Sequence, residues 1–87
     1  MPHYIGEAVA LRIATICDEQ NISINKLSKR AGLTQSTVAS IMSGQTQNAR
    51  IITIKKICDA SNVSLKEFFD HPLFFDCEYT EKKHKKR

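Results

Sequence analysis

The stretch LTQSTVASIMSG, Leu33 to Gly44, combines an apolar edge with an edge of uncharged polar side chains. Gln35, Ser36 and Ser40 belong to that polar edge. Gln and Ser side chains both donate and accept hydrogen bonds. A helix that only faces water usually carries charged residues on its outer side. This edge therefore favours a surface that matches the donors and acceptors of a partner; the alternative is an ordinary polar helix face.

No group of residues predicts catalysis. The sequence contains neither a Gly-rich phosphate loop nor a nucleophile paired with a nearby base. His71, Cys77 and His84 have metal-binding atoms, but their irregular separation across Pro72 and a charged tail does not match a metal-ligand motif. We therefore expect no catalytic residue, no metal site, no cofactor and no enzymatic activity.

The net charge of +4 is unevenly distributed along the chain. Residues 1–22 carry −2, residues 57–81 carry −5, and the last six residues, KKHKKR, carry +5. Residues 23–56 contain no carboxylate and carry +6, from Lys26, Lys29, Arg30, Arg50, Lys55 and Lys56. A block of this kind predicts a face that binds a polyanion. Chance together with a solubilising tail is the alternative.

Length and cysteine content limit the class of protein. With 87 residues the chain is long enough for one domain with a single modest core. No apolar run approaches the ~20 residues of a membrane span, and the first residues do not resemble a secretion signal. The three cysteines are odd in number and form no C-x-x-C pair. We therefore expect a cytoplasmic protein without a membrane partner.

The apolar periodicity is helical almost throughout and predicts an all-α fold of five short helices. Residues suited to a left-handed helix end are Asn21, Gly32, Gly44 and Asn62. Hydroxyl residues suited to cap the following helices are Ser23, Thr34 and Ser64, the last in a capping box with Glu67. The expected helices are therefore about 4–20, 24–31, 35–43, 51–61 and 65–70. The expected core is Leu27, Ala31, Leu33, Val38, Ile41, Ile54, Ile57, Val63, Leu65 and Phe68.

The link AGLT, residues 31–34, has the composition of a helix-turn-helix corner: a small residue, a Gly, an apolar residue and a capping hydroxyl. The surrounding stretch ISINKLSKRAGLTQSTVASIMSG resembles the Cro and phage-repressor type of helix-turn-helix domain (lambda-repressor-like, XRE). The later stretch IITIKKICDASNVSLKEFF is similar to the fourth and fifth helices of that family. The resemblance implies a compact five-helix DNA-binding fold.

The resemblance also implies the site residues. The third helix is expected in the major groove of double-stranded DNA, with Gln35, Ser36 and Ser40 reading bases. Gln can bond to adenine N6 and N7 together, and Ser can bond to several bases. Phosphate contacts are expected from Ser23, Asn25, Thr34, Thr37, Ser43, Gln45, Gln47 and Asn48. Arg50 has a position from which some relatives reach the minor groove; the alternative is a solvated arginine.

Three residues depart from the family pattern. Ile24 stands where the family often has a Gln that braces the recognition glutamine and touches phosphate, and Ile24 can do neither. Ala49 replaces a frequent proline, so the loop before it is less rigid. Ser28 replaces the usual alanine, and its hydroxyl must find a backbone carbonyl or it will cost stability. None of these changes is expected to break the fold.

We expect a DNA-binding domain at residues 1–72 and an extension at 73–87 that is aromatic and then basic. FFDHPLFFDCEY, residues 68–79, contains four Phe and one Tyr, which either fold over the core or form a dimer surface. The basic end is expected to be disordered and to add nonspecific DNA affinity.

The sequence thus favours a sequence-specific transcriptional regulator, a repressor that binds a palindromic operator. We expect a homodimer, because helix-turn-helix proteins commonly bind two half-sites about 34 Å apart as dimers. The alternative is a protein-interaction module that retains the fold, such as an antitoxin-like partner of a second protein.

Overall fold

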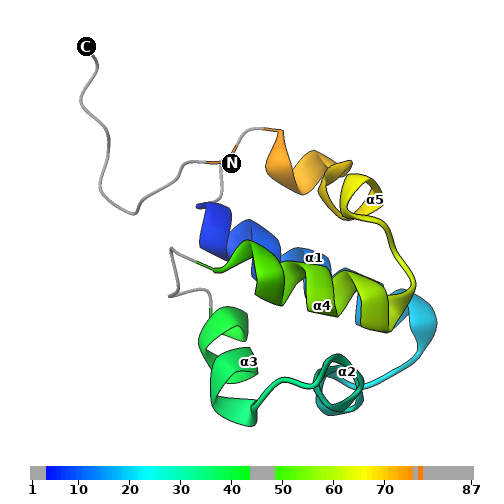
Figure 1. Ribbon diagram of the computed structural model, residues 1–87. Helices are drawn as coiled ribbons and strands as arrows, with labels where there is room; N and C mark the ends of the chain where they lie inside the picture. Colours follow the sequence, from blue (N-terminus) through cyan, green and yellow to red (C-terminus); the bar gives the residue numbers. More distant parts are fainter. Residues whose placement is uncertain (1–3, 44–48, 76, 78–87) are drawn as a thin grey trace.

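The computed structural model describes residues 4–43, 49–75 and 77, and within these ranges it contains helices and no β-strand. The helices are α1 (Ile5–Gln20), α2 (Ile24–Ala31), α3 (Gln35–Met42), α4 (Ile51–Ser61) and α5 (Leu65–Phe69), followed by the 3₁₀ helix η1 (Pro72–Phe74). In Figure 1, α2 and α3 lie at one end of the molecule and α5 lies at the other. The predicted all-α, five-helix fold is confirmed.

The predicted helix ends need small corrections. Tyr4, Ser43 and Asp70, which were expected inside helices, are instead the capping residues of α1, α3 and α5. Tyr4 has an extended backbone, with φ −79° and ψ 151°, so that α1 begins one residue later. The η1 helix that begins at Pro72 was not predicted. Pro fits the first turn of a helix because the amide hydrogen it lacks has no partner there.

Three helix junctions share one three-residue design. A left-handed residue ends the helix, an apolar residue follows, and a hydroxyl residue caps the next helix. The junctions are Asn21-Ile22-Ser23, Gly32-Leu33-Thr34 and Asn62-Val63-Ser64, with left-handed φ angles of 60°, 71° and 63°. The amides of Ile22, Leu33 and Val63 donate to the carbonyls of Cys17, Ser28 and Cys58 at 3.0, 3.0 and 2.9 Å. Three predicted left-handed ends are confirmed; Gly44 lies outside the described residues.

The hydroxyl caps are confirmed at all three junctions. Ser23, Thr34 and Ser64 accept hydrogen bonds from the amides of Lys26, Thr37 and Glu67 at 3.0, 3.2 and 3.0 Å. At the third junction the Ser64 amide also donates to Glu67 Oε1 at 2.9 Å, which completes the predicted capping box. These hydrogen bonds hold the pKa of the Glu67 carboxyl below its ordinary value.

The core lies between α1, α4 and the helix pair α2–α3. Its buried residues are Val9, Ile13, Ile16, Cys17, Leu27, Ile41, Ile54, Ile57, Cys58 and Phe68. Val38, also expected in the core, is 9% exposed. Ala31, Leu33, Val63 and Leu65 are only partly buried and pack against the edge of this cluster. They lie at helix ends or in junctions, where solvent reaches one side. Within this arrangement α2 packs against α4, and α3 packs against α1.

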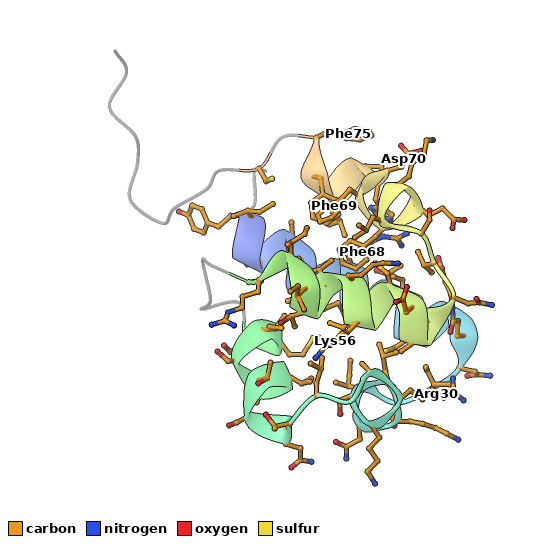
Figure 2. All side chains as sticks on the ribbon, viewed as in Figure 1. Arg30, Lys56, Phe68, Phe69, Asp70 and Phe75 are labelled. Atoms are coloured by element: carbon orange, nitrogen blue, oxygen red, sulfur yellow. The ribbon has the colours of Figure 1, made fainter. Side chains whose placement is uncertain are left out.

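Three aromatic residues of the segment 68–79, namely Phe68, Phe69 and Phe74, pack over the core, and Tyr79 lies outside the described residues. Phe68 is 0% exposed, and its ring centroid lies 4.9 Å from that of Phe69 and 6.0 Å from that of Phe74. The η1 helix, which contains Phe74, packs against α1. Figure 2 shows Phe68 and Phe69 on the inner side of α5, with Phe75 at the outer edge of the molecule. Phe75 is 70% exposed, so it does not contribute to this packing.

Arg12 connects α5 to α1 through a contact that was not predicted from the sequence. Arg12 is 8% exposed. Its Nε donates to the Phe68 carbonyl at 2.8 Å, and its Nη2 donates to the Glu67 carbonyl at 2.9 Å. The guanidinium carbon also lies 5.9 Å from the centroid of the Phe68 ring. Because the last carbonyls of a helix lack partners within that helix, Arg12 supplies the donors that the end of α5 needs.

Replacing Arg12 by Met keeps an apolar stem and removes both hydrogen bonds. We expect the free energy of unfolding to fall by about 3 kcal/mol. Each hydrogen bond to a charged group contributes about 1.5–3 kcal/mol, and the Met side chain retains the apolar packing of the Arg12 stem, which keeps the loss at the low end of the sum. Arg12→Lys keeps the charge but not the planar fork, so it should recover only part of the loss. Urea unfolding followed by circular dichroism measures both variants. A Met variant as stable as the original chain would contradict this role.

Candidate nucleic-acid interface

The angle between α2 and α3 is set at their junction. Gly32 has φ +71°, a conformation that residues with a Cβ rarely adopt. Leu33 packs against the core and so anchors the turn. Ser28, at the close approach of the two helices, is 4% exposed, and its hydroxyl donates to the Asn25 carbonyl at 2.9 Å. The prediction that this hydroxyl needs a backbone carbonyl is confirmed.

The three predicted base-reading residues lie together on the outside of α3. Gln35, Ser36 and Ser40 are all exposed, whereas Val38 and Ile41 on the opposite side are buried. The Ser40 carbonyl accepts a hydrogen bond from Ser43 Oγ at 2.8 Å, which tightens the last turn of the helix. The exposed face of α3 thus presents an amide and two hydroxyls, each of which can donate and accept.

A side-chain hydrogen bond connects the beginnings of the two helices. Gln35 Nε2 donates to Asn25 Oδ1 at 3.0 Å, although the two residues are ten positions apart. Ile24 was expected to leave Gln35 without a brace. That inference was incomplete, because the next residue, Asn25, provides the acceptor. Ile24 is instead half-buried and packs against the core.

A groove runs between α2 and α3 beside this amide pair. It encloses about 280 Å³ and is lined by Ile24, Asn25, Ser28, Gln35, Val38, Ala39 and Met42. Asn25 and Gln35 are exposed at its rim, while Val38 is buried beneath it. The face that carries Gln35 is therefore concave and partly apolar next to its polar residues.

Hydroxyl groups at helix N-termini are the described candidates for phosphate contact. Ser23 and Thr34 are exposed and accept hydrogen bonds as caps, and the Thr34 and Thr37 hydroxyl oxygens lie 3.0 Å apart. The Ser23 hydroxyl accepts from an amide and so retains its hydrogen for a phosphate oxygen, whereas the Thr34–Thr37 pair uses one of its two hydroxyl hydrogens between the two residues and retains the other. Free helix amides and the helix dipole also favour an anion at these positions.

The loop candidates are only partly described. Gln45, Gln47 and Asn48 lie outside the described residues. Ser43 is the exposed C-cap of α3, and Arg50 is the exposed N-cap residue of α4. The Arg50 side chain makes no capping hydrogen bond. Arg50 therefore lies next to the loop that joins α3 to α4, which is the location that the predicted phosphate or minor-groove role requires.

The basic residues of the carboxylate-free block are all exposed. One of them is already paired: Lys55 Nζ lies 2.7 Å from Asp59 Oδ1, and both side chains are largely exposed. This hydrogen bond and the charge of Asp59 raise the pKa of Lys55. The charge of +6 counted for residues 23–56 is therefore larger than the charge available to a polyanion, because Asp59, one helical turn after Lys55, neutralises it. The remaining basic residues are Lys26, Lys29, Arg30, Arg50 and Lys56.

The three residues considered as metal ligands have other contacts or are not described. His71 Nδ1 accepts from the Leu73 amide at 3.2 Å and so caps η1. Cys77 Sγ donates to the Phe74 carbonyl at 3.6 Å. His84 lies outside the described residues. Among the residues that the structure describes, no three His, Cys, Asp or Glu side chains are placed to hold a metal ion.

Comparison with known proteins identifies the family. Residues 12–73 match the Cro/C1-type HTH DNA-binding domain, and the chain belongs to this family. The crystal structure of the prophage Lp1 protein 11 is similar, with a TM-score of 0.77 and 34% sequence identity over 85% of this chain and 97% of that chain. No curated protein sequence matches this chain. The predicted resemblance is thereby confirmed. None of the described helices is long and apolar enough to cross a membrane.

Proposed function

We propose that this chain is a sequence-specific transcriptional regulator, a cytoplasmic repressor that binds a palindromic operator as a homodimer with α3 in the major groove. The observation that carries the proposal is the exposed face of α3 in a Cro/C1-type domain. That face presents Gln35, Ser36 and Ser40 and no charged side chain. Base edges are read by hydrogen bonds, which neutral amides and hydroxyls supply without attracting every phosphate nearby.

The residues around α3 supply the attraction that does not depend on sequence. Ser23 and Thr34 begin α2 and α3, and Lys26, Lys29 and Arg50 are exposed. Contacts from such residues to phosphate fix the register of a protein on the duplex, and base contacts then select the sequence. Occupation of a promoter by such a domain is enough to exclude other proteins. The match to the Cro/C1-type HTH DNA-binding domain supports a DNA-binding regulator.

Interaction with a second protein is the other candidate function. Adjacent residues at the start of α4, Ile51 and Ile52, are 62% and 63% exposed, and such a pair favours contact with an apolar surface. This role is compatible with DNA binding in the same chain. It becomes the main function if selection from random DNA enriches no sequence.

Gln35→Ala tests the base-reading role. Duplexes are first selected from a random pool with the unaltered protein, and both proteins are then titrated with the selected and with random duplexes. We expect the preference for the selected duplex to fall by ~1–3 kcal/mol, because one base loses its partner.

Gln20→Ala is the matched control for this test. Gln20 lies on α1 and donates to the Ser61 carbonyl, so its loss should lower stability and leave the sequence preference unchanged. Equal discrimination by Gln35→Ala and the unaltered protein would exclude Gln35 from base reading.

Arg50→Ala tests the phosphate contact at the start of α4. We expect weaker binding to all duplexes and a salt dependence of the binding constant that is lower by about one unit, since one fewer counterion is released. Lys66→Ala removes the same charge from α5 and should leave the salt slope unchanged. Fluorescence anisotropy at several salt concentrations measures both slopes. An unchanged slope for Arg50→Ala would show that Arg50 does not contact phosphate.

Sedimentation tests the dimer. The protomer has a mass of 9.8 kDa. At micromolar concentration, with a duplex that contains two selected half-sites, we expect two protomers on each duplex, because half-sites one helical turn apart match a two-fold protein. A single protomer in solution and one protomer on each two-site duplex would contradict the homodimer.

A further inference from the structure

We infer that the groove between α2 and α3 binds the C5 methyl group of a thymine, so that the chain selects thymine close to the base that Gln35 reads. The inference rests on the proposed function and deepens it, since it adds an apolar base contact to the same interface. It is carried by the apolar walls of the groove, which Ile24 provides from α2 and Ala39 and Met42 provide from α3.

The apolar walls of the groove are open to a ligand. Ala39 is exposed, and Ile24 and Met42 are half-buried, whereas Val38 is buried beneath them. Residues four and seven positions after Gln35 lie on the same side of a helix as Gln35 itself. Ala39 and Met42 therefore continue the face of Gln35 as a strip of apolar side chains. Water over such a strip is held weakly, so an apolar group of a ligand displaces it with a gain in affinity.

The charges around the groove favour a nucleic-acid strand as its occupant. The described residues that line the groove all belong to residues 23–56, which contain no carboxylate, and none of them is charged. Lys26 and Lys29, also on α2, are exposed. An apolar segment of a protein would gain little from these cations. A DNA strand that places a base edge in the groove also carries phosphates that the two lysines attract.

Thymine is the base whose edge fits these walls. Of the four bases, only thymine presents an apolar group in the major groove, its C5 methyl, and alanine is one of the side chains that contact this methyl group. Cytosine presents its N4 amino group instead, which needs an acceptor. The side chains of Ile24 and Ala39 contain no acceptor, so they favour thymine over cytosine.

The spacing along α3 locates this thymine relative to the base that Gln35 reads. A rise of 1.5 Å per residue places Ala39 about 6 Å from Gln35 along the helix axis. Successive nucleotides are ~3.4 Å apart along the duplex axis. The two contacts therefore fall within about two base-pair steps of each other, and we expect a thymine at this distance from the position that Gln35→Ala affects.

The test removes the methyl group from the DNA. Duplexes are selected from a random pool by the unaltered chain, and each thymine of one half-site is then replaced in turn by uracil, which pairs as thymine does and lacks only the C5 methyl. Fluorescence anisotropy measures the binding of the unaltered chain, Ile24→Thr and Ala39→Ser to each duplex. For the unaltered chain we expect uracil at the predicted position to weaken binding about fourfold, the value of one buried methyl group. In both variants this thymine-to-uracil ratio should fall toward one.

Ile22→Thr is the matched control. Ile22 is also half-buried and packs against the core, but it precedes α2 and does not line the groove. Its thymine-to-uracil ratio should equal that of the unaltered chain. Because each ratio compares two duplexes with one protein, a loss of stability in a variant does not change it.

Three results would overturn the thymine contact and leave the proposed function intact. They are a selected half-site in which no uracil at the predicted distance weakens binding, a ratio that Ile24→Thr and Ala39→Ser leave unchanged, and an equal fall of the ratio in Ile22→Thr. Failure of the unaltered chain to enrich any sequence would overturn the proposed function itself.

Discussion

The structure depends on the three-residue junction that turns the chain at the end of a helix. At Gly32-Leu33-Thr34 the left-handed residue reverses the backbone, Leu33 anchors the turn in the core, and Thr34 begins α3. Each part satisfies backbone groups that a helix end would otherwise leave without partners. The junction therefore sets the direction of α3 relative to α2. The hydrogen bond between Gln35 and Asn25 requires that direction, since the two residues come from different helices.

The core residues and the residues proposed to contact DNA lie on different sides of the same helices. On α3, Val38 and Ile41 are buried while Gln35, Ser36 and Ser40 are exposed. On α1, Arg12 faces inward and holds the end of α5, which lies at the opposite end of the molecule from α2 and α3 (Figure 1). Helices as short as α2 and α3 are marginal by themselves, so their order comes from packing. This division leaves the exposed residues free to differ between relatives without loss of the fold.

Much of the fold was predictable because its signals are local. Asn, Gly and hydroxyl residues at the junctions marked the helix ends, and the apolar spacing marked the buried faces. Contacts between distant segments were not predictable from such signals. Arg12 reaches the carbonyls of Glu67 and Phe68 through the folded core, and Gln35 meets Asn25 only because the junction turns α3. The charge pattern also overstated the basic face, since a count by segment does not show that Asp59 pairs with Lys55.

The most direct test of the account is a map of the DNA contact surface, made by following the backbone amides of the ¹⁵N-labelled protein by NMR during titration with a duplex. If α3 enters the major groove, the largest shifts occur at residues 23–26 and 34–40, around the beginnings of α2 and α3. Shifts concentrated on α5 and η1, with α3 unchanged, would contradict it.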